Sequence, residues 1–340
     1  MRKFVTAVLA SMLMSGAALA QEKLVVNGWG GPFQALVMAT VAKKFTKETG
    51  VPVEIVTGGT IDRLNRARVV KDNPESDVTF TTSHVGWLYV NDGLFEKLDF
   101  SKIPNAKNLI PKAKASDYHL GFYGYIYSIA YRTDLVPPGV TFASWQELWK
   151  PELKGMIGLA DFDASHIIKV ATLLDGKPLE DWEAAQPKLM ALKPNLKAFY
   201  SNSATSIQLM SSGETPVQVL LSSNAYNMMA QGVPLKLAVP KEGAILGLDT
   251  IAITKGTKKL ELAYKFVNAA LDPQVQAEVS KMQKASPVVV GVAVDPDIAK
   301  LPGIFSSAEQ WDKDALVSND KVRAEMLGKW NAWFAKNMMN

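Results

Sequence analysis

Residues 23–58 read KLVVNGWGGPFQALVMATVAKKFTKETGVPVEIVTG and place a strand, a helix and a second strand in immediate succession. The apolar runs at 23–28 and 51–58 predict buried strands. Between them, apolar residues recur at helical spacing from Phe33 to Phe45, after Pro32 and before Gly50, the residue types that favour a helix start and a helix end. This order requires a crossover between parallel strands, so it predicts an α/β fold.

The strand and helix alternation continues beyond this stretch. A third strand at 76–82 and a short helix at 84–93 complete the first unit. The aromatic, β-prone run at 121–136 is long enough to pass from one half of the molecule to the other, and 130–245 read as a second α/β unit. A return strand and a helical C-terminal region follow, so we expect two α/β lobes.

The first 20 residues have the pattern of a secretory signal peptide. Two basic residues precede a short apolar region, and Ala18-Leu19-Ala20 form a small-x-small cleavage site. We therefore expect a mature chain that begins near Gln21 and acts in the periplasm. The absence of cysteine excludes a disulfide, a thiolate metal site, a catalytic cysteine and a lipid anchor on cysteine. The formal charge of +4 predicts neither nucleic-acid binding nor membrane insertion.

Catalytic and cofactor motifs are scarce. The three histidines, His84, His119 and His166, form no HExxH pair, and the sequence has no GxSxG, GxxxxGK[ST] or GxGxxG motif. We expect no metal, no cofactor and no enzymatic activity. Asp161 and Asp163 leave one alternative open, a secreted hydrolase that uses paired carboxylates, with His166 as a further candidate.

Four segments resemble the periplasmic solute-binding proteins of ABC importers, especially the spermidine/putrescine-binding branch. They are FTKETGVPVEIV (45–56), GYIYSIAYRTDLV (124–136), SWQELWKPELKGMIGLAD (144–161) and VPKEGAILGLDTIAI (239–253). The resemblance implies a two-lobed fold of type II, each lobe a mostly parallel sheet flanked by helices, with a ligand cleft that closes about a hinge. It also implies delivery of a small solute to a membrane permease by a monomeric protein.

The resemblance divides the chain approximately. It implies that residues 21–127 and 250–305 form lobe 1, whereas 128–249 and 306–340 form lobe 2.

Polyamine-binding members enclose the ligand with aromatic rings and hold its ammonium groups with carboxylates. Carried over to this sequence, the resemblance matches Trp29 to a pocket aromatic, Thr82 to a pocket serine and Asp249 to a pocket carboxylate. A pair of acidic residues falls near Asp163 and His166, so one acid is lost. Several aromatic positions of the family are replaced here, at Pro32, His84, Leu221, Gly247 and Lys284.

These replacements remove much of the aromatic enclosure and add a cation, so the sequence favours a zwitterion or a small organic acid. Polyamine binding remains the alternative. Thr82, Ser83, Lys284 and the Gly30-Gly31 turn would suit an anionic group, and Asp249 would suit an amine. The predicted ligand-binding residues are Trp29, Gly30, Gly31, Thr82, Ser83, His84, Tyr125, Asp163, Thr205, Ser222, Asp249 and Lys284.

Several of these residues also have a structural interpretation. Gly30-Gly31 could be a tight strand-to-helix turn that needs a small backbone. Trp29 could pack between the lobes, Asp249 could cap a helix, and Lys284 could be solvated at a helix end. Thr205 and Ser222 stand where helices are expected to begin, which favours capping. Tyr125 belongs to an alternating series with Tyr123 and Tyr127, and such a series on one strand face is typical of a core.

Overall fold

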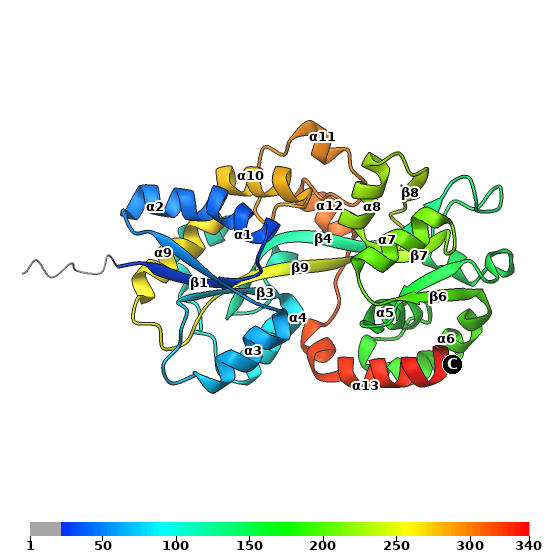
Figure 1. Cartoon of the computed structure of the whole chain (residues 1–340), viewed down its shortest axis with the longest axis horizontal. Helices are drawn as coiled ribbons and strands as arrows, with labels where there is room; N and C mark the ends of the chain where they lie inside the picture. The colour runs from blue at the N-terminus through cyan, green and yellow to red at the C-terminus, as the bar shows by residue number, and fades with distance from the viewer. Residues whose placement is uncertain (1–21, 340) are drawn as a thin grey trace, which may run out of the picture.

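The computed structural model describes residues 22–339, so the predicted signal peptide at 1–20 lies outside the described residues. It shows an α/β molecule built on one continuous mixed sheet with the strand order β2-β1-β3-β9-β4-β7-β5-β6 (Figure 1). Two short strands pair at its side, β8 with β4 and β10 with β9. No helix within 22–339 has the length and apolar character needed to cross a membrane.

The strands are β1 (Leu24–Gly28), β2 (Val53–Thr57), β3 (Val78–Thr82), β4 (His119–Arg132), β5 (Ile157–Ala160), β6 (Leu196–Tyr200), β7 (Val217–Leu221), β8 (Leu235–Leu237), β9 (Ala244–Ile253) and β10 (Ala315–Leu316). The α-helices are α1 (Pro32–Val37), α2 (Lys43–Thr49), α3 (Thr60–Val69), α4 (Ser83–Asn91), α5 (Ser165–Leu174), α6 (Gln186–Leu192), α7 (Ser203–Ser212), α8 (Ser222–Ala230), α9 (Leu260–Ala270), α10 (Pro273–Gln283), α11 (Pro296–Ala299), α12 (Ala308–Asp314) and α13 (Asp320–Met338). Short 3₁₀ turns include η5 (Trp145–Trp149) and η7 (Leu179–Ala185).

Two parallel groups of strands stand at opposite ends of the sheet. At one end β1 pairs in parallel with β2 and β3, and at the other β5 pairs in parallel with β6 and β7. We call the end that holds β1, β2 and β3 lobe 1 and the end that holds β5, β6 and β7 lobe 2. The predicted parallel strands are confirmed in both lobes.

The long strands β4 and β9 run between the lobes, antiparallel to each other. Their pairing extends from His119 opposite Ala252 to Tyr127 opposite Ile245. From Tyr127 onward β4 pairs with β7 of lobe 2, whereas β9 pairs with β3 of lobe 1. Because both strands belong to both lobes, the centre of the sheet is antiparallel, a feature that the strand and helix alternation did not predict.

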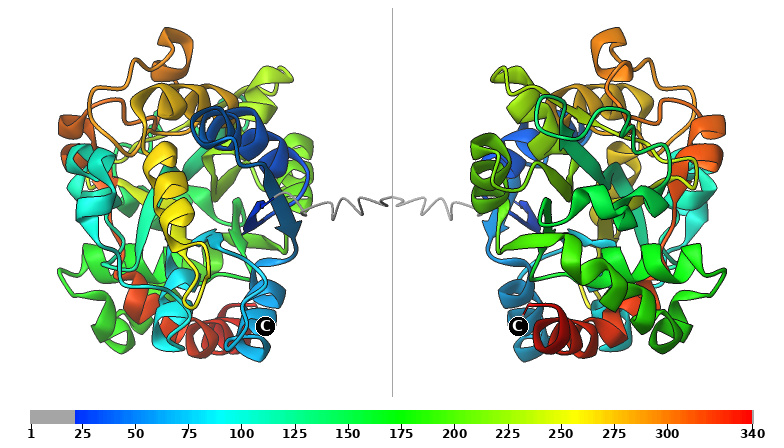
Figure 2. Two further views of the ribbon diagram at one scale, coloured as in Figure 1. Left: turned by 90° about the vertical axis from the view of Figure 1, so that its left-hand side faces the viewer. Right: turned by 90° about the vertical axis from the view of Figure 1, so that its right-hand side faces the viewer.

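Helices cover both faces of the sheet, as the two end views show (Figure 2). One apolar core lies beneath α1, α2, α9 and α10 of lobe 1, with Phe33, Phe45 and Phe266 among its buried rings, and it extends into lobe 2 as far as Tyr200 and Met228. A smaller core under α3 and α4 lies on the other face. In lobe 2 a core around Trp145 and Trp182 includes Trp330 of α13. The buried apolar faces therefore fix both lobes on one sheet.

The helix that the opening stretch predicts runs from Pro32 to Thr49, but a π-helical turn at Met38–Ala42 divides it into α1 and α2. Gly50 ends it in the left-handed conformation, with φ 73°, which glycine adopts without steric cost. Gly59 is the N-cap of α3, and the Thr60 hydroxyl accepts a hydrogen bond of 2.8 Å from Trp29 Nε1.

Helix α13 connects the lobes on one side of the molecule (Figure 1). Its C-terminal half packs into the core of lobe 2 through Trp330 and Phe334. Its first turns contact α4 of lobe 1, where Lys321 Nζ lies 5.8 Å from the ring centre of Trp87. Residues at the start of α13 are thereby placed between the two lobes.

Candidate functional site

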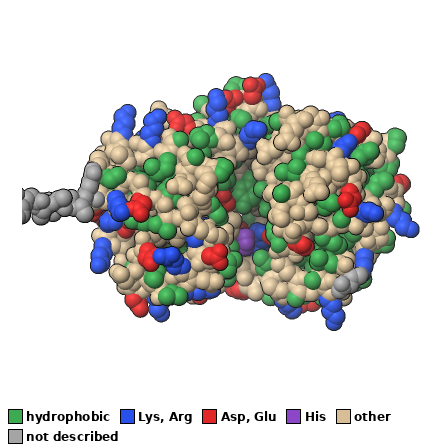
Figure 3. All heavy atoms as spheres, in the orientation of Figure 1, with side chains coloured by type: hydrophobic (Ala, Val, Ile, Leu, Met, Phe, Trp, Pro, Cys, Tyr) green, Lys and Arg blue, Asp and Glu red, His purple; other side chains and the backbone are tan. Residues whose placement is uncertain are grey.

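Two adjoining cavities, of about 540 and 290 Å³, lie between the lobes. They share Thr60, Thr82, Tyr125 and Tyr127, so we describe them together as the cleft. The space-filling view shows this hollow between the lobes, with a histidine side chain visible within it (Figure 3). A cleft at the carboxyl ends of sheet strands is the usual ligand position in open α/β folds.

A carboxylate held by two tyrosines forms the floor of the larger cavity. Asp249 on β9 stands opposite Tyr123 on β4 in the strand register. The Tyr123 hydroxyl donates a short hydrogen bond to Asp249 Oδ2, and the Tyr125 hydroxyl donates to Oδ1 at 3.4 Å. Burial raises the pKa of Asp249 to about 6, although the two hydroxyls and the charge of Arg63 act in the opposite direction. No cation bonds to this carboxylate within residues 22–339.

Aromatic side chains enclose this floor. Tyr123, Tyr125 and Tyr127 alternate along β4 and all three line the cleft, so the shared face predicted from their spacing is confirmed. Trp29 follows β1 and forms another wall, with its ring edge-on to Phe33 at a centroid distance of 4.8 Å. The cleft thus keeps an aromatic lining that the replaced positions alone did not suggest.

Two polar groups of the cleft have no partner among residues 22–339. Lys284 ends α10 in the left-handed conformation, with φ 50°, and lines the larger cavity. Its ammonium has no ion pair or hydrogen bond within the described chain. The Thr82 hydroxyl lines both cavities and is buried without a partner. Both groups remain available to donate to a bound molecule.

The smaller cavity is bordered by a buried ion network. Arg323 of α13 donates a short hydrogen bond to Asp163 Oδ2, and the Ser165 backbone N–H donates to Asp163 Oδ1 at 3.1 Å. Burial opposes ionisation of Asp163, but the charge of Arg323, the two neighbouring histidines and the Ser165 hydroxyl together outweigh it and hold the pKa of Asp163 far below its usual value. Asp320 accepts from Arg323 at 3.5 Å and from the Ser83 side chain.

His84 of the cleft and His166, which lines a separate small cavity with Asp163, border this network and are neutral at pH 7. Burial lowers the pKa of His166 to about 4, and its ring stacks on Tyr127 at 3.9 Å between centroids. Burial and the Arg323 charge also hold the pKa of His84 well below the usual histidine value. Neither ring therefore supplies a positive charge to the cleft near neutral pH.

The structure brings nine of the twelve predicted residues to the cleft: Trp29, Thr82, Ser83, His84, Tyr125, Asp163, Ser222, Asp249 and Lys284. Gly30, Gly31 and Thr205 are not among its lining residues. Gly31 is the N-cap of α1, with φ 61°, and supports a tight strand-to-helix turn. The Thr205 backbone N–H donates to the side chain of Asn202, which is the N-cap of α7. For these three positions the structural interpretation fits the geometry.

The sequence reasoning missed several residues of the cleft. Tyr123 and Tyr127 were assigned to a core, although their alternation with Tyr125 was the signal that placed them together. Asp320 and Arg323 come from α13, far away in sequence, and only their i, i+3 spacing indicated a helical pair. Phe162, exposed at the rim of the smaller cavity, carried no signal.

Comparison with known proteins agrees with this architecture. The sequence pattern of the family described as bacterial extracellular solute-binding protein matches residues 40–306. The spermidine/putrescine-binding periplasmic protein of Salmonella typhimurium is 28% identical over 291 residues, covering 80% of this chain and 82% of that protein. The gamma-aminobutyric acid-binding protein of Pseudomonas aeruginosa is 26% identical over 351 residues, covering 96% of each chain.

A solved structure of an ABC transporter protein from Clostridium perfringens is similar, with a TM-score of 0.84 and 29% identity, covering 93% of this chain and 100% of that one. The shared fold, the cleft between two lobes and the family match over most of the chain lead to one conclusion. This chain belongs to the bacterial extracellular solute-binding protein family, whose members serve ABC transporters.

Proposed function

We propose that this protein captures a small zwitterion, one that carries an amine and a carboxylate, for an ABC importer. The observation that carries the proposal is the pair formed by Asp249 and Lys284, which line the same cavity. Asp249 has only hydroxyl donors and Lys284 has no partner within residues 22–339, so a ligand of both charges would neutralise both groups. A diamine would satisfy Asp249 and leave Lys284 unpaired.

The names of the relatives support a small solute that carries an amine, but these solutes differ in net charge. One relative is named for gamma-aminobutyric acid, an amino acid with its amine and carboxylate at opposite ends, and another for spermidine and putrescine. Those names describe those proteins. For this chain, the free lysine in the cleft favours an ω-amino acid over a polyamine, and a small organic acid without an amine would leave the buried Asp249 without a cation.

The remaining features of the proposal follow the family. We propose a monomeric periplasmic protein that closes about β4 and β9 and delivers unchanged solute to a membrane permease. The lobe boundaries at 127/128, 249/250 and 305/306 remain predictions. For the alternative, a secreted hydrolase, Asp163 is a poor acid or base because its carboxylate is bonded to Arg323 and Ser165.

Calorimetric titration of the mature chain would test the proposal with four probes: γ-aminobutyrate, putrescine, succinate and acetate. We expect γ-aminobutyrate to bind at a stoichiometry of one and more tightly than the other three. Tighter binding of putrescine would overturn the zwitterion proposal and favour the polyamine alternative. Formation of any new product from a probe, followed by NMR, would overturn the claim that solute is released unchanged.

Two variants, each of which replaces a charged side chain by a neutral one of similar size, distinguish binding of the ligand's amine from binding of its carboxylate. Asp249→Asn should weaken binding of γ-aminobutyrate and putrescine but not of succinate, because it removes the partner of an amine. Lys284→Gln should weaken binding of γ-aminobutyrate and succinate but not of putrescine. Loss of one partner of a desolvated charge pair costs about 2–5 kcal/mol, or roughly 30-fold in Kd at the least.

Lys281→Gln provides the matched control. Lys281 lies on the same helix, α10, but is exposed and ion-paired with Asp295 at 2.9 Å, outside the cleft. Its replacement should leave all four affinities unchanged. Equal effects of Lys281→Gln and Lys284→Gln would mean that the lysines act only through overall charge, and Lys284 would then be removed from the site.

A further inference from the structure

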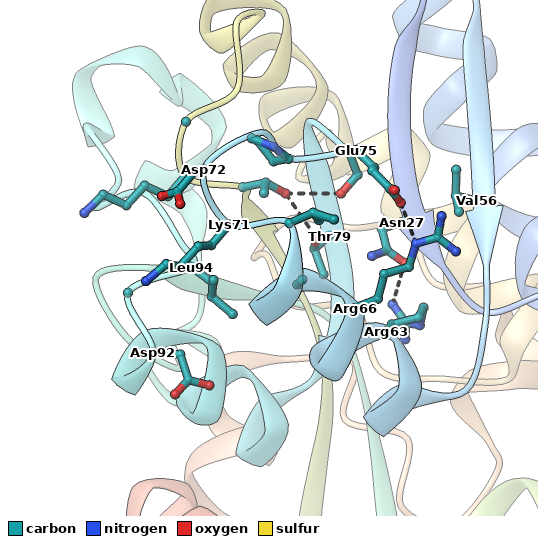
Figure 4. Close-up of a pocket in the computed structure, with 18 of the residues that line it drawn as sticks. Asn27, Val56, Arg63, Arg66, Lys71, Asp72, Glu75, Thr79, Asp92 and Leu94 are labelled. Atoms are coloured by element: carbon teal, nitrogen blue, oxygen red, sulfur yellow. Dashed lines mark hydrogen bonds and ion pairs between the residues drawn. The ribbon is translucent and has the colours of Figure 1, made fainter.

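A second cavity, of about 530 Å³, lies on lobe 1 and shares no lining residue with the cleft. It is formed by α3, by the ends of β1 and β2, by β3 and by the loop that follows α3 (Figure 4). We call it the α3 cavity. Its volume lies within the range of small-ligand sites in proteins, which is about 300–1,000 Å³.

The α3 cavity is bordered by a buried arginine that lacks a counter-ion. Arg63 is only 4% exposed. Its guanidinium donates to the carbonyl oxygens of Gly58 at 3.0 Å and Phe80 at 2.7 Å and to Asn27 Oδ1 at 3.3 Å. All three acceptors are neutral, and Nη2 is buried with no hydrogen-bond partner in the described part of the chain. A buried charge is costly unless it is paired.

The charges around the cavity leave a positive excess at the Arg63 end. Arg63, Arg66, Lys71 and Lys255 line it, against the carboxylates of Asp72, Glu75 and Asp92. Glu75 is already bonded to Arg66 at 2.5 Å, and Asp92 is bonded to Arg68 at 2.8 Å. Figure 4 shows Arg63, Arg66 and Asn27 close together, with Asp92 well away from them. No carboxylate therefore neutralises Arg63 directly.

We propose that the α3 cavity is a second binding site, for a small oxyanion that pairs with Arg63. Nε and Nη1 already donate to Gly58, Phe80 and Asn27, so an oxyanion would accept a charge-assisted hydrogen bond from Nη2, the donor that has no partner. Asn27 strengthens the match because its Oδ1 accepts from Arg63, which leaves its Nδ2 as a donor. The site would hold its anion whether or not a solute occupies the cleft.

Arg63 also touches the cleft through one aromatic ring. Its Cζ lies 4.8 Å from the ring centre of Trp29, and Trp29 lines the larger cavity. An anion that draws the guanidinium into a new pair would weaken this cation–π contact. The two sites are therefore coupled, and the coupling must be reciprocal: each ligand changes the affinity of the other by the same factor.

Acetate and inorganic phosphate are the probes for the test, titrated into the mature chain at constant ionic strength with chloride as the reference anion. We expect saturable binding of at least one of them at a stoichiometry of one, detected by calorimetry and by the indole N–H resonance of Trp29. Preference for acetate or for phosphate identifies the oxyanion class. Absence of saturable binding by both probes would overturn the proposal.

Two variants locate the site. Arg63→Gln removes the charge, and Ala67→Phe fills the cavity from α3 while leaving Arg63 intact. Both should abolish anion binding, whereas Lys47→Gln, an exposed lysine of α2 that lines neither cavity, should not. In Lys284→Gln, which removes the proposed carboxylate partner in the cleft, the anion binding that Ala67→Phe abolishes should persist. Loss of binding in Lys284→Gln with retention in Ala67→Phe would place the anion in the cleft and overturn the second site.

Discussion

The ring of Tyr125 lies across the backbone of Gly247, its partner in the register between β4 and β9. A Cβ built on Gly247 would stand 2.2 Å from Tyr125 Cε2, well inside contact distance. Where polyamine-binding members are expected to carry a tryptophan, this chain has a glycine that makes room for a tyrosine from the neighbouring strand. Tyr125 can therefore reach Asp249 and donate to its carboxylate.

We predict that Gly247→Ala displaces the Tyr125 ring and destabilises the protein by about 1–3 kcal/mol, the usual cost of overpacking. The affinity for an amine-bearing solute should fall as well. Combining Gly247→Ala with Tyr125→Ala should recover most of the stability, because the clash is removed. Gly328→Ala on α13 is the control, since a Cβ there meets no atom within 4 Å. Urea denaturation of these three variants and of Tyr125→Ala alone checks the prediction, which additive costs in the double variant would contradict.

We predict that binding of an amine-bearing solute weakens as the pH falls through about 6. Burial raises the pKa of Asp249 to about 6, so the carboxylate becomes neutral below that pH and loses its attraction for an ammonium group. Titrations of γ-aminobutyrate between pH 5 and pH 8 measure the effect. The slope should disappear in Asp249→Asn, and a slope that persists in this variant would assign the titration to another group.

The same carboxylate should make the free protein less stable at neutral pH. The pKa of Asp249 is higher in the folded state than in the unfolded state. Its contribution to the free energy of unfolding is therefore fully present below about pH 4, where the carboxyl is protonated, and is lost as the pH rises through 6. A difference of about two in pKa between the folded and unfolded states corresponds to roughly 2–3 kcal/mol of unfolding free energy. Asp249→Asn should therefore raise the stability of the ligand-free protein at pH 7 and change it much less at pH 4. Lower stability at pH 7 would show that the tyrosine hydrogen bonds outweigh burial.

The ion pair between Arg323 and Asp163 should be essential for stability. We predict that Arg323→Met costs about 3–5 kcal/mol, because it leaves Asp163 buried without its cation. Lys329 lies on the same helix as Arg323 and forms an exposed ion pair with Glu183. Lys329→Met breaks that pair and should cost about 1 kcal/mol or less. Denaturation at pH 7 and pH 4 tests both, and the cost of Arg323→Met should shrink at low pH as Asp163 takes up a proton. Similar costs for the two variants would argue against the buried pair.

Two threonines on β3 should behave in opposite ways. The Thr82 hydroxyl is buried in the cleft without a partner, so Thr82→Val should keep or raise stability and weaken solute binding. The Thr79 hydroxyl bonds to Thr254 at 3.1 Å, away from the cleft, so Thr79→Val should cost about 1 kcal/mol and leave affinity unchanged. Thermal melts and titrations of both variants decide the matter. Unchanged affinity in Thr82→Val would remove this hydroxyl from the site.

The local pattern of the sequence predicted the outer strands of both lobes, because each strand and each amphipathic helix is short and carries its own periodicity. The antiparallel pairing at the centre of the sheet could not be predicted from local sequence patterns. Strands β4 and β9 are separated by more than 110 residues, and their pairing depends on how two lobes meet. The π-helical turn at Met38–Ala42 was also not predicted, because its apolar residues keep the spacing of an α-helix.

The candidate site shows the same division between local and distant information. Trp29, Thr82 and Asp249 follow strand ends or lie on strands that the pattern located, so their convergence could be predicted. Arg323 reaches the cleft only because α13 packs against α4 and lobe 2 at once, which no local signal records. Thr205 is governed by local information instead, since its backbone N–H donates to the cap at Asn202.

The position of Asp249 and Tyr123 on the two strands that join the lobes has a consequence for how specificity can evolve. These side chains stand on the ladder of paired strands that joins the lobes, so a change there alters the mechanics of the whole molecule together with its ligand. Leu221 and Lys284 stand instead at the end of a strand and at the end of a helix around the cleft, where a new side chain disturbs little else. New solutes are therefore most readily accommodated by changing these positions, while the floor is inherited.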